Sequence, residues 1–317
     1  MLRKKLILLL MTIFVGTAVY SAEKIRVTAP DGLPALALVK MINEDNIIGE
    51  KEIEYKIEKI SESLVMELMK KNADIAIVPS NLAGQLYNKG LGYKIAGTVG
   101  WGSFYVISRE DINSTAKLKG EEVYTIGKGL TPDIIFQTIL KENKITPQKD
   151  IKINYLTGGN ELAPLYLAGK ADRAVVSEPV LSRILSKDGK TKINISLNDE
   201  WKKIFKTERG YPQSTLIVSE ELLEKNPELV DKFIEKLKES TAFIRSSDER
   251  REEYLKNAGL TTVGIDILPQ VTERADIGFT SAEEGAKEYM IYFEKIAEND
   301  KKAIGGKIPD EKIFISK

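Results

Sequence analysis

The stretch ADIAIVPSNLAG at Ala73–Gly84 decides the fold class of this sequence. Asp74–Val78 is short, apolar and rich in isoleucine and valine, which is typical of a strand buried on both faces of a parallel sheet. Pro79 ends this strand, because proline lacks the backbone N–H that a sheet requires. Ser80 and Asn81 follow as turn residues. The stretch therefore predicts a buried strand that ends in a polar loop.

The same order of strand and helix recurs on both sides of this stretch. Lys24–Thr28 and Glu52–Ile60 are predicted strands that flank a helix over residues 34–43. Further predicted strands cover residues 93–99, 104–108, 122–126, 152–156, 173–176 and 215–218, with helices at 131–142 and 161–168. This alternation predicts an α/β fold in which helices cover parallel sheets.

The strand–helix units form two sets that no Ser/Gly-rich linker separates. We expect two lobes, with residues 23–110 plus 208–317 as lobe I and residues 111–207 as lobe II, inserted into it. The C-terminal part is mainly helical. Asn226-Pro227-Glu228 has the residues of a helix start, and Ser281 with Glu284 forms a capping box for a last long helix.

Residues 1–22 have the pattern of a secretory signal peptide. A basic start at Arg3–Lys5 is followed by the apolar run Leu6–Val19. The small residues Ser21 and Ala22 precede a polar chain, so we expect cleavage near Ser21 or Ala22. An uncleaved membrane anchor is the alternative. The apolar run is shorter than the ~20 residues that a spanning helix needs, which favours the signal peptide.

The composition excludes several classes of function. The 317 residues carry 47 basic and 47 acidic side chains with no basic tract, so no nucleic acid, DNA included, is expected as a partner. The sequence has no cysteine and no histidine. Disulfides, thiolate chemistry, Ser-His-Asp hydrolysis and histidine-ligated zinc are therefore excluded, and we expect no cofactor and no metal. A lipid anchor on an N-terminal cysteine is excluded too.

The candidate binding residues are those that follow the predicted strands. In an open parallel sheet, ligands bind beyond the carboxyl ends of the strands, where loops and helix N-termini expose N–H groups. Loops rich in Gly, Ser, Thr and Asn follow the strands at residues 29–34, 79–81, 100–103, 127–131, 157–160 and 177–179. From these loops and the later return strand we single out Trp101, Glu178 and Tyr211, and we assign no catalytic residue.

Two of these residues have an alternative interpretation. Trp101, which stands between two glycines, could stack on a flat ligand group or pack in the core at a strand end. Glu178 could pair with a ligand amine or stabilise the N-terminus of the next helix. Tyr211 and Gln213 precede a strand that leaves lobe II, where a hinge would face the cleft.

Four stretches resemble the bacterial extracellular solute-binding proteins of ABC importers, in particular the nitrate/sulfonate/taurine and thiamine-pyrimidine-precursor binding group. They are residues 28–34, ADIAIVPSNLAG at 73–84, GEEVYTIGKGLTPD at 120–133 and LAGKADRAVVSEPV at 167–180. Residues 219–237 resemble the helix that follows the return crossover in that group. The resemblance implies a periplasmic-binding-protein-like fold, with two parallel-sheet α/β lobes and a ligand cleft between them. Carried over by motif, it also implies ligand contacts from Asp31, Gly32, Ser80, Asn81, Trp101, Gly129, Thr131 and Glu178.

The resemblance also implies a function in transport. A monomeric protein of the periplasm would capture a small-molecule solute and deliver it to a permease with its ATPase. The alternative is a carboxylate-based enzyme or a biosynthetic protein on the same fold. Lys128 is the only obvious cation in the candidate loops, which disfavours a multiply charged anion. Trp101, Tyr211 and Glu178 favour a flat or weakly basic molecule such as a pyrimidine-like vitamin precursor, with a sulfonate or related compound as the other expectation.

Overall fold

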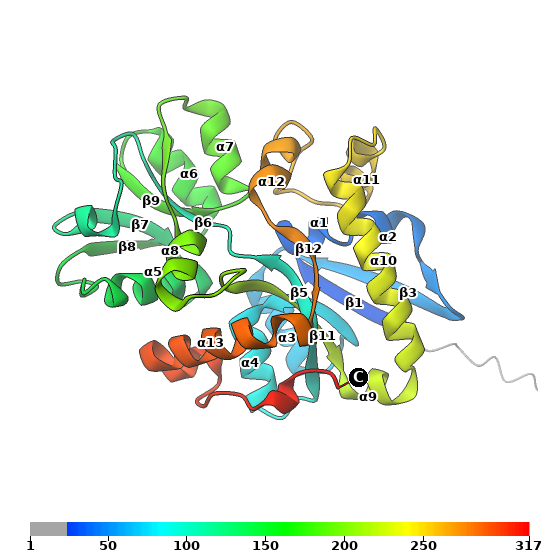
Figure 1. The fold of residues 1–317 in the computed structure, drawn as a ribbon. Coiled ribbons are helices and arrows are strands. Elements are labelled where there is room, and N and C mark those ends of the chain that lie inside the picture. Colours follow the sequence, from blue (N-terminus) through cyan, green and yellow to red (C-terminus); the bar gives the residue numbers. More distant parts are fainter. Residues whose placement is uncertain (1–23, 317) are drawn as a thin grey trace, which may run out of the picture.

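The computed structural model describes residues 24–316, which form two β-sheets with helices on both faces of each (Figure 1). The predicted signal peptide, residues 1–22, lies outside the described residues. Within residues 24–316, no helix has both the length and the apolar character needed to cross a bilayer.

The larger sheet has seven strands in the order β12-β5-β11-β4-β1-β3-β2. Their bounds are Ile25–Pro30 (β1), Ile47–Ile48 (β2), Lys51–Glu58 (β3), Ile75–Pro79 (β4), Tyr93–Trp101 (β5), Pro212–Ser219 (β11) and Ile277–Ser281 (β12). Strands β1, β3 and β4 are parallel, whereas β11 runs antiparallel to both β4 and β5. The last residues of β1, β4 and β5 therefore lie at the same end of the sheet as the first residues of β11.

The smaller sheet has five strands in the order β10-β6-β9-β7-β8. Their bounds are Phe104–Ser108 (β6), Glu122–Ile126 (β7), Lys152–Leu156 (β8), Arg173–Ser177 (β9) and Lys192–Ser196 (β10). Strand β7 is parallel to β8 and β9, whereas β6 is antiparallel to β9 and β10. The first residues of β6 thus lie beside the last residues of β9.

The predicted α/β fold class is confirmed, but both sheets are mixed rather than parallel. The chain crosses from the larger to the smaller sheet after β5 and returns before β11. Strands β6 and β11 begin at these crossings, so they run opposite to the strands that end there. Strand β6 accordingly pairs in the smaller sheet, although the sequence-based division assigned residues 23–110 to lobe I.

The helices enclose three apolar clusters. One face of the larger sheet packs against α1 (Leu33–Leu36), α2 (Val39–Glu44), α9 (Glu220–Lys225), α10 (Pro227–Arg245), α11 (Arg251–Asn257) and α12 (Leu268–Arg274). Its other face packs against α3 (Ser61–Met69), α4 (Ser80–Asn88) and α13 (Ala282–Asp300). In the smaller sheet, α5 (Thr131–Glu142) and α8 (Leu197–Phe205) lie opposite α6 (Gly159–Leu167) and α7 (Val180–Lys187).

Some elements match the sequence-based expectation closely and others do not. The capping box of Ser281 and Glu284 opens α13, and α5 covers the predicted residues. The expected helix over residues 34–43 is divided into α1 and α2. Strands β2, β10 and β12 were not predicted, because none of them has an apolar run of strand length.

The two crossing segments pack tightly against each other. The Gly102 N–H donates to the carbonyl of Tyr211 at 3.1 Å, and the Phe104 N–H donates to the Tyr211 hydroxyl at 3.3 Å. A side chain at Gly102 would collide with the Tyr211 ring, and one at Gly210, where φ is 97°, would collide with the Asn198 amide. Glycine is therefore required at both positions of the crossing.

Candidate functional site

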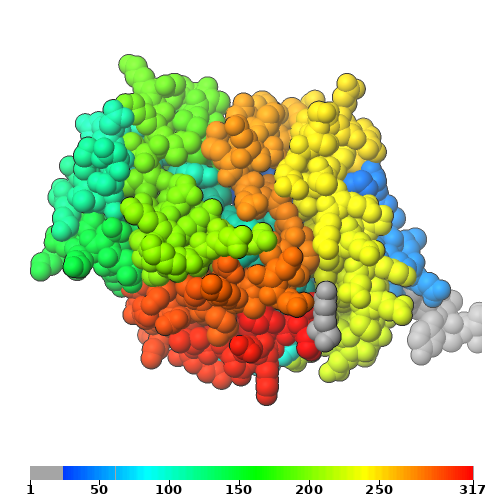
Figure 2. Space-filling model, viewed as in Figure 1, coloured from blue at the N-terminus to red at the C-terminus, as the bar shows by residue number. Residues whose placement is uncertain are grey.

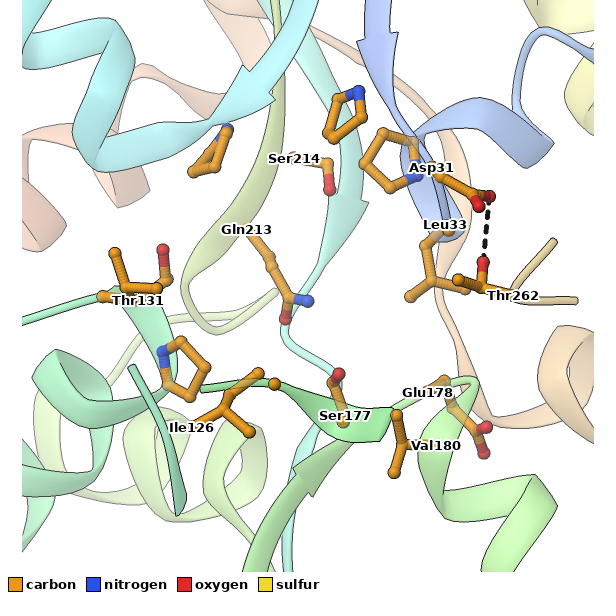
Figure 3. Close-up of a pocket in the computed structure, with 18 of the residues that line it drawn as sticks. Asp31, Leu33, Ile126, Thr131, Ser177, Glu178, Val180, Gln213, Ser214 and Thr262 are labelled. Atoms are coloured by element: carbon orange, nitrogen blue, oxygen red, sulfur yellow. Dashed lines mark hydrogen bonds between the residues drawn. The ribbon is translucent and has the colours of Figure 1, made fainter. Parts of the chain in front are cut away.

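A cavity of about 580 Å³ lies between the two sheets, at the ends of their parallel strands. The larger sheet contributes the loops after β1 and β4 and the start of β11. The smaller sheet contributes the loops after β7, β8 and β9 and the start of β6 (Figure 3). The walls are largely apolar, with five prolines and side chains such as Leu33, Phe104, Ile126 and Val180. A cavity of this size and character suits a small organic molecule.

Five of the nine predicted binding residues line the cavity, namely Asp31, Gly32, Asn81, Thr131 and Glu178. They lie in the loops after β1, β4, β7 and β9, where the strand-end argument places them. Their position shows that they face the same space. That they contact a ligand stays a prediction.

Asp31 connects the loop after β1 to the loop between α11 and α12. Its Oδ2 accepts hydrogen bonds from the Thr261 hydroxyl at 2.6 Å and the Thr261 N–H at 3.2 Å. Its Oδ1 accepts one from the Thr262 hydroxyl at 3.0 Å, the dashed line in Figure 3. Both carboxylate oxygens therefore have partners within the protein.

Asn81 and Thr131 meet across the cleft. Thr131, at the start of α5, donates its hydroxyl hydrogen to Asn81 Oδ1 at 3.1 Å. The Asn81 side-chain amide donates to the carbonyl of Ala303 at 3.3 Å, which holds its orientation from behind. The two predicted residues thus form a direct hydrogen bond between the sheets at one side of the cavity.

Glu178 forms an ion pair across the cleft. Its side chain is fully buried, and Oε1 accepts a charge-assisted hydrogen bond from Arg274 Nε at 2.6 Å. Oε2 accepts the backbone N–H of Ser182 at 3.2 Å, and Arg274 also donates to the Ser182 hydroxyl at 2.6 Å. Glu178 therefore both stabilises the start of α7 and joins it to α12, so a ligand amine would have to share its carboxylate with these donors.

Arg183 on α7 makes a second contact near this ion pair. Its guanidinium donates to the Thr262 carbonyl at 2.7 Å, so Thr262 bonds to Asp31 on one side and Arg183 on the other. Figure 2 shows the result on the surface, where the orange residues around α12 lie between the green α7 region and the yellow α10–α11 region. We call residues 258–275 the strap. The strap belongs to the larger sheet's core and reaches the smaller lobe through Arg274 and Thr262.

Four predicted binding residues, Ser80, Trp101, Gly129 and Tyr211, are not among those that line the cavity. Trp101 is 4% exposed, its indole N–H donates to the Thr280 hydroxyl at 3.2 Å, and a side chain added at Gly285 on α13 would contact its ring. In this structure it packs as a core residue at a strand end, as the alternative interpretation of the sequence has it. Tyr211 is fully buried and packs against Phe104 and Trp201 at the crossing. Gly129 instead donates its N–H to Asp133 at 2.8 Å.

Ser80 belongs to a buried network of hydroxyl groups behind the cavity. Its hydroxyl lies 2.7 Å from that of Thr215, which lies 2.7 Å from that of Tyr289. Thr98 donates to the same tyrosine oxygen at 2.9 Å. We call Ser80, Thr98, Thr215 and Tyr289 the hydroxyl network. It joins α4, β5, β11 and α13, and every hydroxyl in it has a protein partner.

The sequence-based selection missed several lining residues. Gln213 and Ser214 open β11, and Phe104 opens β6, so they lie at the binding end because these strands are antiparallel to their neighbours. Gln213 was noted beside Tyr211 but not selected. Ser177 stands in the loop that supplied Glu178 and was passed over for the charged residue. Thr262 carries no signal in the sequence, because nothing in its surroundings predicts the strap.

The electrostatics of the site involve few titratable groups. Within residues 24–316, no group of three or more Asp, Glu, His or Cys side chains is placed to hold a metal ion. Burial raises the pKa of Tyr105 to about 12, with the charge of Glu178 adding to the effect. The Tyr105 hydroxyl donates to the Arg274 carbonyl at 3.0 Å, so it belongs to the same inter-lobe contact.

Comparison with known proteins identifies the family of this chain. The profile of the NMT1/THI5-like family matches residues 50–250. No curated protein sequence gives a significant match.

Solved structures of similar fold cover nearly the whole chain. An ABC transporter protein from Parabacteroides distasonis is 27% identical, with a TM-score of 0.79 over 93% of this chain and 99% of that one. The periplasmic aliphatic sulphonate-binding protein SsuA from Escherichia coli is 17% identical, with a TM-score of 0.72 over 94% and 93% of the two chains. The periplasmic nitrate-binding protein NrtA from Synechocystis PCC 6803 is 12% identical, with a TM-score of 0.55 over 75% and 66%. At 17% and 12% identity, the last two comparisons show similarity of fold alone.

Proposed function

The chain belongs to the NMT1/THI5-like family, and from that premise we propose that it is the substrate-binding component of an ABC import system. In this function the protein captures a small organic solute between its two lobes and releases it to a membrane permease driven by an ATPase. It acts as a monomer and performs no chemistry on the solute.

One observation supports this proposal most strongly. Both lobes line the cavity, and hydrogen bonds between the lobes close it. The bond from Thr131 to Asn81 lies on one side, and the bonds from the strap to Glu178 and Arg183 lie on another. A solute in this cavity would touch both lobes at once. Its binding energy would therefore stabilise the closed arrangement over an open one.

The proposed compartment is the periplasm. The signal-peptide pattern of residues 1–22, with cleavage near Ser21 or Ala22, supports export. Structurally similar proteins from Escherichia coli and Synechocystis are described as periplasmic. The lobe limits proposed with this function are the crossing segments, after β5 and before β11, so that the first limit precedes β6 instead of falling at 110/111 and the second lies near 207/208.

We propose the chemical class of the ligand and not a particular compound. Trp101 and Tyr211 no longer support a flat ligand, because both are buried away from the cavity. The five prolines and Phe104 supply flat apolar faces in their place. We therefore keep a pyrimidine-like vitamin precursor as the preferred class, with a sulfonate or related compound as the competing one.

A thermal-shift screen of the mature protein against nitrate, ethanesulfonate, taurine, amino acids and small heteroaromatic compounds tests this function. A true ligand at a hundredfold excess over Kd should stabilise the fold by about 3 kcal/mol. Small-angle scattering should then show a smaller radius of gyration with ligand than without it. A protein with no stabilising solute and no compaction is not a binding component of this kind.

The enzyme alternative requires a different result. If the protein is a carboxylate-based enzyme, a bound compound should be converted during hours of incubation, as mass spectrometry of the mixture would show. Asp31 and Glu178, the two carboxylates at the cavity, are both occupied by internal hydrogen bonds, which is a poor arrangement for acid–base catalysis. Recovery of unchanged compound supports transport, and turnover contradicts it.

A further inference from the structure

We propose that the ligand is uncharged and that the Ser177 and Ser214 hydroxyls hydrogen-bond to it from opposite lobes, whereas the charged side chains of the cavity hold the lobes together. This assignment rests on the proposed solute-binding function and specifies its ligand class. It follows from how the charged groups and the hydroxyl groups at the cavity are already used.

The charged groups at the cavity are engaged by the protein itself. Glu178 is bound by Arg274 and by the Ser182 N–H, and its side chain is fully buried. The carboxylate oxygens of Asp31 accept three hydrogen bonds from the strap. A cationic ligand would have to share either carboxylate with these partners.

The balance of charge is unfavourable to an anion as well. Among the lining residues there is one basic side chain, Arg183, against the two acidic side chains of Asp31 and Glu178. Arg183 is bonded to the strap through the Thr262 carbonyl. An anion would lose its hydration beside two carboxylates in a largely apolar cavity, where one shared guanidinium is the basic side chain that faces it.

The two serine hydroxyls differ from the charged groups, because they have no protein partner. Among the hydrogen bonds of residues 24–316, none involves the side chain of Ser177 or of Ser214, although both residues line the cavity. Figure 3 shows the two hydroxyls pointing toward one another across the cavity, from β9 and from β11. A hydroxyl both donates and accepts, so this pair suits a neutral ligand with a polar group at each side.

Gln213 lies between the two serines and provides a third polar contact (Figure 3). Its Oε1 accepts the Ser103 N–H at 2.7 Å, and its Nε2 donates to the Ser103 hydroxyl at 3.0 Å. One Nε2 hydrogen remains for a ligand acceptor. Because Ser103 lies in the crossing between the lobes, the ligand would also contact the hinge through this amide.

A matched series of compounds that differ only in charge tests the assignment. The series consists of 4-amino-5-hydroxymethyl-2-methylpyrimidine, its phosphate ester and its 5-aminomethyl analogue, and nitrate and ethanesulfonate serve as small anions. Isothermal titration of the mature protein at neutral pH should show that the uncharged member binds ~10-fold or more tightly than either charged member. Equal or tighter binding of any charged member overturns the charge assignment while leaving the transport function intact.

The outcome for the proposed function is separate. If no compound in this series or in the wider solute screen binds, the transport function fails and the charge assignment falls with it. If a solute binds without compaction of the protein, closure between the lobes fails, whatever its charge.

Variants of the two serines identify the groups that bind the ligand. Ser177→Ala and Ser214→Ala should each weaken binding of the best uncharged compound ~10-fold, because each leaves one ligand polar group without its partner. Ser186→Ala is the matched control, since Ser186 is exposed on α7 and outside the cavity. Unchanged affinity in both serine variants, with all three proteins folded by circular dichroism, overturns the assignment.

Discussion

The cavity and the hydroxyl network are neighbouring regions of the molecule, but their hydroxyl groups differ in whether they have protein partners. Ser80 and Asn81 are consecutive, but Ser80 belongs to the network and Asn81 lines the cavity. In the network every hydroxyl has a protein partner, whereas at the cavity Ser177 and Ser214 have none among the described residues. Partnered polar groups stabilise the scaffold, and unpartnered ones that face a cavity indicate where a ligand binds.

The charged contacts between the lobes are a third group of polar interactions. Their loss should have the largest effect on the ligand Kd. Arg274→Met leaves the buried carboxylate of Glu178 without its ion partner in the closed form. We expect a loss of about 3 kcal/mol, which corresponds to a ~100-fold rise in the ligand Kd if it acts on closure. Stopped-flow kinetics should assign most of this change to faster dissociation.

Two further variants sharpen this prediction. Glu178→Gln keeps an acceptor for the Ser182 N–H but removes the charge, so it should raise Kd by less than Arg274→Met does. Arg245→Met removes an exposed arginine at the end of α10 and should leave Kd unchanged. An Arg274→Met protein with wild-type dissociation kinetics would show that the ion pair has no part in closure.

Substitutions in the hydroxyl network should lower the stability of the fold and leave the ligand Kd unchanged. Tyr289→Phe leaves Thr98 and Thr215 without their common partner in a fully buried position. We expect the free energy of unfolding in urea to fall by about 1–3 kcal/mol, because the buried Thr98 hydroxyl loses its partner while Thr215 keeps only Ser80. The ligand Kd should stay within a factor of ~2, and a larger change would erase the distinction between network and cavity.

Trp101 offers a smaller test of the same distinction. Trp101→Phe keeps an aromatic ring in the core and removes the hydrogen bond to Thr280. The expected cost is about 1 kcal/mol of stability, with no change in affinity. A contact between Trp101 and the ligand would give the opposite result. The variant would bind the ligand more weakly, and ligand would change the tryptophan fluorescence of the wild-type protein more than that of the variant.

The smallest effect is expected from pH. The sequence has no histidine and no cysteine, and burial raises the pKa of Tyr105 to about 12. Tyr105 stays neutral in the closed protein, so its contribution to stability is fully present below about pH 10 and is lost as the pH rises beyond that. Ligand affinity by titration should be constant between about pH 6 and 8, and a step in that range would reveal a titrating group at the cavity.

The sequence predicted the fold more fully than the site, for a physical reason. The strands Ile75–Pro79 and Arg173–Ser177 are recognisable from their own apolar residues, without knowledge of the tertiary contacts. The ends of these strands set the position of the cavity. Strand ends fix where a loop lies but not which side chain turns inward. Ser80 and Trp101 stand at the right ends and face the core instead.

The rest of the site depends on features that no local pattern carries. Gln213 and Ser214 line the cavity because β11 enters the sheet in reverse, which follows from the crossover and not from its own residues. Thr262 and Arg274 reach the smaller lobe only because the strap lies across the cleft, far along the chain from their partners. Long-range packing of this kind is set by the whole fold.

The most direct test of the account is a crystal structure of the protein with its tightest-binding solute. The account predicts density in the cavity between the two sheets, within hydrogen-bond distance of Ser177 and Ser214, with the ion pair of Glu178 and Arg274 intact. A solute bound outside this cavity, or one held by Glu178 with Arg274 displaced, would contradict it.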